Sequence, residues 1–289
     1  MNLTTGATDA RVGTAQATIA LQTANQATFW TYLPITISRA ITGAIALVKK
    51  GLGVLTLSGT NTYSGNAAID EGIVSITSTA SLPGYNTNGR YSVAPAATLA
   101  VYNAVTDAEI LAIRGTTNFQ ALSRLGFDTT SGNRTYTPAI SNTSQGALGL
   151  VKLGANQLTL GGVSTYTGPT IVLAGTLATN AANLIPDASA ITIASGATLQ
   201  LGGDETIATL DGAGTLTTAN ALAFSSNNSA VFSGTITSTL ATNAAFYRYG
   251  TGSQTLSGTV TLSAVFRHDN GTMITVSYTH LRAHETLRY

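Results

Sequence analysis

The chain has 289 residues, a formal net charge of +1 and 9% charged residues, against about 25% in an ordinary soluble domain. Hydrophobic residues make up 44% of the sequence, so the chain has enough apolar content to form a core. The near-neutral charge argues against nucleic acid or an anionic membrane as a partner. The absence of cysteine excludes disulfides and cysteine-based metal sites.

The first 42 residues are expected to form β-structure that precedes a repetitive region. Residues 17–21 and 32–37 have the composition of strands. Phe29 and Trp30 lie between them, and we interpret both as packing residues of the core or of a coil end. The alternative is a platform on which a sugar stacks.

A repeated motif begins at Gly43 and again at Gly146, an offset of 103 positions without gaps. Each copy contains a basic residue and a glycine, an alternating Leu-Thr-Leu strand, a further glycine and a polar turn around one tyrosine. A degenerate third copy occupies residues 248–258. The alternation predicts leucines facing inward and threonines facing outward.

Strands of four or five residues recur every eight to twelve residues between Gly- and Asn-rich turns, which fits a sandwich, a barrel or a parallel β-helix. The long period of the motif favours stacked coils. Tight Asn-Gly or Asp-Gly hairpin turns are also few. The sequence therefore predicts an all-β, parallel β-helix, or β-solenoid.

Residues 49–65 and 152–177 resemble the autotransporter-associated β-strand repeat, also called the passenger-associated transport repeat. The hallmark is a basic residue and glycine, then Leu-Thr-Leu-Ser-Gly, then Asn-Thr-Tyr-Ser-Gly and a Gly-Thr-Leu strand. The resemblance implies a right-handed β-helix passenger that is exported to the outer-membrane surface by a barrel of the same chain. We divide the chain into leading coils (1–42), a first repeat unit (43–145) and a second unit with the degenerate motif (146–275).

Residues 103–126 depart from the coil pattern. Thr106 and Glu109 form a capping box, and apolar residues with roughly helical spacing follow them. We expect a short helical insertion near 107–114. It is interpreted as a packing insert, with a binding protrusion as the alternative.

Two carboxylate doublets are the candidates for acid–base catalysis, Asp70-Glu71 and Asp204-Glu205. Neighbours on a strand point to opposite faces, and glycines adjoin both doublets, so we interpret them as solvated turns. His268 is interpreted as a surface residue. The sequence therefore predicts no catalytic residue, no cofactor site and no metal site.

The basic and aromatic residues of the motif have two interpretations each. Lys49-Lys50 and Lys152 are expected to be solvated residues beside a turn, with a partner site as the weaker alternative. Tyr63 and Tyr166 are expected to pack in turns, because two tyrosines several coils apart cannot form one glycan-binding platform.

The tail, residues 276–289, is expected to lie outside the fold. Residues 276–286 resemble the translation of a transposon-based sequencing-library adapter, as if the gene had been read from a short DNA fragment. On that interpretation the lack of a signal peptide after Met1 says nothing about compartment. His280 and His284, with Glu285, would share a helix face as metal ligands, but the adapter accounts for them.

The function expected is a non-catalytic structural or adhesive segment of a surface passenger. Its expected partners are host or surface glycans and proteins, neighbouring coils and the outer-membrane barrel, and not nucleic acid. The alternative is a polysaccharide-binding or -cleaving β-helix of lyase or tailspike type. A phage fibre is a third hypothesis.

Overall fold

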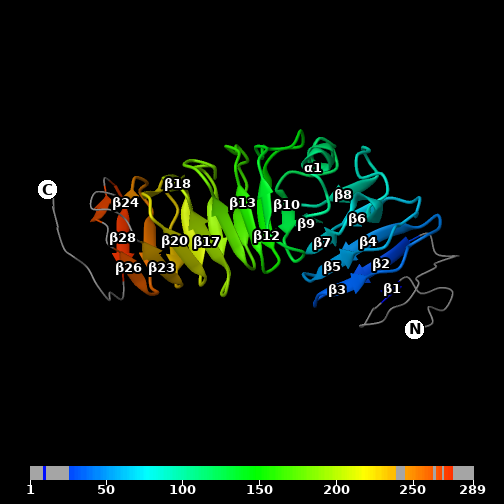
Figure 1. The fold of residues 1–289 in the computed structure, drawn as a ribbon, viewed down its shortest axis with the longest axis horizontal. Coiled ribbons are helices and arrows are strands. Elements are labelled where there is room, and N and C mark those ends of the chain that lie inside the picture. Colours follow the sequence, from blue (N-terminus) through cyan, green and yellow to red (C-terminus); the bar gives the residue numbers. More distant parts are fainter. Residues whose placement is uncertain (1–8, 11–25, 239–244, 263–264, 269, 276–289) are drawn as a thin grey trace. The chain divides into compact units, whose positions relative to one another are not determined.

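The computed structural model describes residues 9–10, 26–238, 245–262, 265–268 and 270–275. The strand expected at residues 17–21 and the tail at 276–289 lie outside the described residues. The chain divides into two compact units, residues 1–131 with 142–151, and residues 132–141 with 152–289. Each unit is a β-solenoid of parallel strands, and together they contain about 12 turns with the right-handed sense expected of parallel crossovers (Figure 1).

The first unit stacks its strands in two sheets. One sheet contains β1 (Asp9–Ala10), β2 (Gln26–Trp30), β4 (Ala46–Lys50), β6 (Ala67–Ile69) and β8 (Tyr91–Val93). The other contains β3 (Ile35–Ile37), β5 (Val54–Leu57), β7 (Ile73–Ile76), β9 (Thr98–Tyr102) and β10 (Ser123–Asp128). From β2 to β9 the chain alternates between the two sheets, so each of these coils contributes one strand to each. A short 3-10 helix, η1 (Thr79–Ser81), lies between β7 and β8.

The second unit has three sheets: two contain a strand from nearly every coil, and the third begins later in the unit. The first contains β11 (Arg134–Tyr136), β13 (Gln157–Leu160), β15 (Thr176–Thr179), β17 (Thr198–Leu201), β20 (Thr215–Thr218), β23 (Thr235–Ser238) and β26 (Val260–Leu262). The second contains β14 (Thr170–Val172), β16 (Ala190–Ile193), β19 (Thr209–Gly212), β22 (Ala230–Phe232), β25 (Ser253–Leu256) and β28 (Thr272–Thr275). The third contains β18 (Glu205–Ile207), β21 (Leu222–Phe224), β24 (Ala245–Arg248) and β27 (Val265–His268). β12 (Leu148–Leu153) contributes residues to both units.

The core is made by the inward residues of the alternating strands. β5 and β13 alternate as predicted: their leucines are buried and their threonines are partly exposed. Because the strands are parallel and in register, each inward leucine lies over its counterpart in the next coil, as Leu55 lies over Val74. The solenoid core is therefore a set of apolar ladders.

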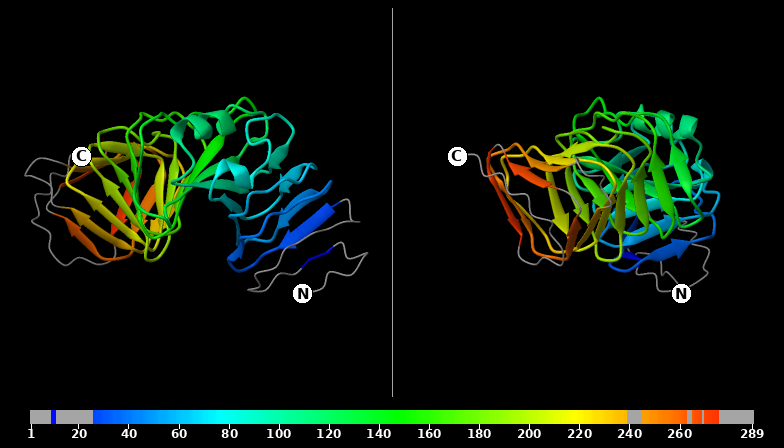
Figure 2. Two further views of the ribbon diagram at one scale, coloured as in Figure 1. Left: turned by 45° about the vertical axis from the view of Figure 1, so that its right-hand side comes forward. Right: turned by 60° about the vertical axis from the view of Figure 1, so that its left-hand side comes forward.

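The helical insertion has the predicted limits. α1 (Asp107–Arg114) begins at the Thr106 N-cap and has both hydrogen bonds of the capping box to Glu109. Ile110 and Ile113 are fully buried, and α1 lies against the outside of the first unit's coils (Figure 2). No helix in the described part of the chain is long and apolar enough to cross a membrane.

Candidate functional site: the basic corner of the repeat

The basic residue of the motif is buried, so the expectation that Lys49 and Lys152 are solvated is wrong. Lys49 is 2% exposed and Lys152 is 0% exposed. Lys49 pairs in the sheet with Phe29 on one side and Ile69 on the other, and both neighbours belong to the core. The lysine therefore occupies an inward position at the corner where the chain turns from one sheet to the next.

In the first copy, the ammonium of Lys49 donates to three backbone carbonyls. The acceptors are the oxygens of Lys50 at 3.0 Å, Gly51 at 2.6 Å and Glu71 at 3.1 Å. An ammonium has three N–H donors, so this arrangement uses all of them. Two acceptors belong to the turn of the same coil and the third belongs to the next coil. The lysine thus joins consecutive coils.

The second copy repeats this geometry. Lys152 Nζ donates to the carbonyls of Leu153 at 2.7 Å, Gly154 at 2.8 Å and Ala174 at 2.9 Å. Ala174 stands where the first copy has Glu71. Since only the carbonyl of that residue is used, the position accepts either side chain.

The degenerate third copy also has a buried cation, but this cation bonds to the preceding coil and not to the next one. Arg248 is 1% exposed, and its guanidinium donates to the carbonyl of Gly252 in its own turn at 3.2 Å. It also donates to the carbonyls of Ser226 and Asn228 in the preceding coil. We define the corner cations as Lys49, Lys152 and Arg248.

A glycine completes each corner, 23 positions after the cation. Gly72, Gly175 and Gly271 all have a positive φ, of 67°, 63° and 75°. A Cβ on Gly175 would lie 2.5 Å from the carbonyl oxygens of Gly154 and Asn156. In the first two copies, the missing side chain lets the next turn approach closely enough for its carbonyl to reach the lysine.

Burial lowers the pKa of Lys49 to about 8, and the nearby carboxylate of Glu71 offsets part of that effect. Glu71 is exposed, and its carboxylate accepts a hydrogen bond from Gly51 N at 2.8 Å. Asp70 is partly exposed and lies 3.8 Å from the ammonium of Lys50. The Asp70-Glu71 doublet lies in a turn at the surface, as predicted. Its carboxylates bind Lys50 and the backbone of Gly51.

The second carboxylate doublet does not fit its predicted role. Asp204 is exposed and accepts from Ala221 N at 2.8 Å, but Glu205 is 2% exposed. The Glu205 carboxylate accepts from Leu184 N at 3.3 Å and Ile185 N at 2.9 Å. Burial raises its pKa to about 7, against the effect of those two N–H groups. Strand β18 alternates with a two-residue period, so Glu205 lies on the same face as buried Ile207. This alternation was the sequence signal that Glu205 is buried.

The polar turn of the motif is packed inside the solenoid. Tyr63 is 1% exposed and Tyr166 is 0% exposed, which confirms turn packing. The Asn61 side chain accepts from Ile41 N at 2.8 Å in the preceding coil. Ser164, at the equivalent position, accepts from Ile140 N at 3.2 Å. The first residue of this turn is therefore a second link between coils, which the sequence did not reveal.

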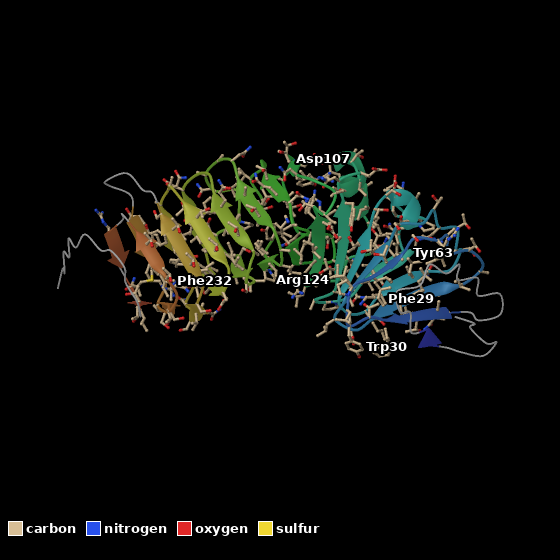
Figure 3. All side chains as sticks on the ribbon, turned by 60° about the horizontal axis from the view of Figure 1, so that its bottom comes forward. Phe29, Trp30, Tyr63, Asp107, Arg124 and Phe232 are labelled. Atoms are coloured by element: carbon tan, nitrogen blue, oxygen red, sulfur yellow. The ribbon has the colours of Figure 1, made fainter. Side chains whose placement is uncertain are left out.

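The remaining candidates separate into core, surface and undescribed residues. Phe29 is 2% exposed and belongs to the core, as expected. Trp30 lies on the outer side of the same strand and is only partly buried (Figure 3). His268 ends strand β27, but its side chain, like His280 and His284, lies outside the described residues.

Comparison with known families identifies the motif that contains the corner. The family model of the passenger-associated-transport-repeat matches residues 47–76 and residues 150–178. Each match contains one corner lysine and the glycine 23 positions after it. No curated protein and no solved structure matches the chain. Two segments of this parallel β-solenoid thus match the passenger-associated transport repeat.

Proposed function

We propose that this chain is a non-catalytic segment of an autotransporter passenger, which is exported across the outer membrane and displayed at the cell surface. The presence of two passenger-associated transport repeats carries the proposal. In this role the chain is a spacer that holds its outer residues away from the cell.

The chemistry of the repeated corner supports a structural role for the repeat. The ammonium groups of Lys49 and Lys152 are committed to backbone carbonyls and are withdrawn from solvent. The groups that a catalytic site would use are also engaged in the fold, because the carboxylates of Glu71 and Glu205 accept backbone hydrogen bonds. A polysaccharide-cleaving β-helix would need such carboxylates to converge on a groove.

Surface display tests the proposal. The chain would be fused between a signal peptide and an outer-membrane barrel in a Gram-negative host, and intact cells would be treated with protease and with antibody. We expect the chain to be accessible on intact cells. We expect less surface-exposed chain for the double variant Lys49→Met, Lys152→Met and no change for Lys50→Met. Retention of the wild-type chain inside cells that display a control passenger through the same barrel would refute the proposal.

A further inference from the structure

Among the residues that the structure describes, the three most exposed large hydrophobic side chains lie together in the first unit. Tyr32 is 71% exposed, Leu33 is 76% exposed and Leu52 is 80% exposed. The turn that carries Leu52 stacks directly on the turn of the preceding coil, because Gly53 N donates to Thr31 O at 2.8 Å. We call Tyr32, Leu33 and Leu52 the apolar ridge. A contiguous exposed group of this kind usually marks an interaction site.

Folding does not require a leucine at position 52. The same turn carries Ala155 in the second copy and Thr251 in the third. In each copy a positive-φ glycine of the next coil, Gly175 or Gly271, packs on this residue. Ala155 and Thr251 are exposed, as Leu52 is. The corner forms with a methyl group or a hydroxyl in that place, so packing of the corner does not account for a large apolar side chain at position 52.

An aromatic and charged border adjoins the apolar ridge. Trp30, Lys50 and Asp70 occupy successive coils on the outer side of the solenoid. The Lys50 ammonium lies 5.5 Å from the centroid of the Trp30 ring and 3.8 Å from the Asp70 carboxylate. Thr31 between Trp30 and Tyr32 is buried, so both aromatic residues face outward, and Figure 3 shows Trp30 at the rim of the strands.

We propose that the apolar ridge and its border of Trp30, Lys50 and Asp70 form a binding site for neutral oligosaccharides. A pyranose ring has an apolar C–H face that stacks on aromatic and aliphatic side chains, and hydroxyls that bond to an ammonium and a carboxylate. The border contains one ammonium, that of Lys50, and one carboxylate, that of Asp70, so the site has no excess positive charge to attract an acidic sugar. This site does not depend on export and goes beyond the proposed function.

Fluorescence titration of the full-length chain tests the site, because Trp30 is the only tryptophan. The probes are cellopentaose, chitopentaose and maltopentaose, with polygalacturonate as the acidic counterpart. We expect a saturable change in Trp30 emission with at least one neutral pentasaccharide and none with polygalacturonate.

Exposed residues allow variants that keep the fold, which circular dichroism would verify. Tyr32→Ala and Leu52→Ala should each raise the Kd at least about tenfold, as expected for anchor residues of a binding site. Val231→Ala is the matched control, because Val231 is 55% exposed in the other unit, and it should leave the Kd unchanged. The proposal is overturned if no neutral pentasaccharide binds, or if binding survives in both ridge variants. Self-association through the ridge without sugar binding would also overturn it.

Discussion

Adjacent lysines with opposite environments allow a direct test of the corner cation. Lys49 is buried and Lys50 is partly exposed. Methionine matches lysine in shape as far as the ε position but has no charge and no N–H donor. We expect Lys49→Met to destabilise the first unit, and Lys50→Met to have little effect.

The magnitude follows from the hydrogen bonds that Lys49→Met removes. The carbonyl of Lys50 keeps a donor in Thr31 N, whereas those of Gly51 and Glu71 lose the ammonium. The carbonyl of Gly51 is buried and that of Glu71 is partly buried, and leaving the two without the ammonium costs about 1–3 kcal/mol each, with Glu71 at the lower end. Removing a charge whose pKa has fallen from 10.5 to about 8 returns at most roughly 3 kcal/mol. At the middle of the range for the two carbonyls, about 4 kcal/mol, the net loss should be at least about 1 kcal/mol at pH 7.

The control loses only surface contacts. Lys50 and Asp70 form a partly exposed pair at 3.8 Å, and such pairs contribute about 0.2–1 kcal/mol. Urea unfolding followed by Trp30 emission is the assay, because Trp30 pairs with Lys50 in the sheet and reports on these coils. Equal midpoints for Lys49→Met and Lys50→Met would show that the buried hydrogen bonds add nothing to stability.

Three further predictions concern other links between coils. Glu205 has a pKa of about 7 in the folded state against 4.5 when unfolded, so the free energy of unfolding should fall by roughly 3 kcal/mol as the pH rises from 4.5 through 7. Urea unfolding at pH 5 and pH 8 should show this fall for the wild type and not for Glu205→Gln. The same fall in the variant would contradict the assignment to Glu205. Gly175→Ala should lower the free energy of unfolding by at least about 2 kcal/mol more than Gly196→Ala, because both glycines have positive φ but only Gly175 lacks space for a Cβ. Thermal unfolding of the two variants measures the difference. Equal losses would mean that the close approach of the coils is unimportant. Thr106→Ala should cost about 1 kcal/mol and speed hydrogen exchange of the amides at the start of α1, and unchanged exchange would show that the capping box does not hold the helix.

The features that follow local rules were predictable from the sequence. Strand alternation needs only the two-residue period, and β5 and β13 follow it. The limits of α1 follow from its capping box, because the hydrogen bonds at issue lie within four residues.

The corner cations were not predictable from local rules. Lysine is almost never fully buried without partners, and the partner that decides the outcome for Lys49 is the carbonyl of Glu71, 22 positions further along the chain. Consecutive residues of β4 are also buried, so the two-residue period gives no guidance at the corner. The constant spacing from cation to glycine in all three copies was the available signal, and only the stacking of coils gives it meaning.

The division of the corner into a fixed interior and a variable exterior has an evolutionary consequence. The cation and the glycine are constrained by atoms of the neighbouring coil, whereas the residue three positions after the cation is Leu52, Ala155 or Thr251 in the three copies and is exposed in each. Mutations at that outer position leave the coil-to-coil bonds intact. A lineage can therefore replace the surface that its solenoid presents, one coil at a time, without passing through an unfolded intermediate.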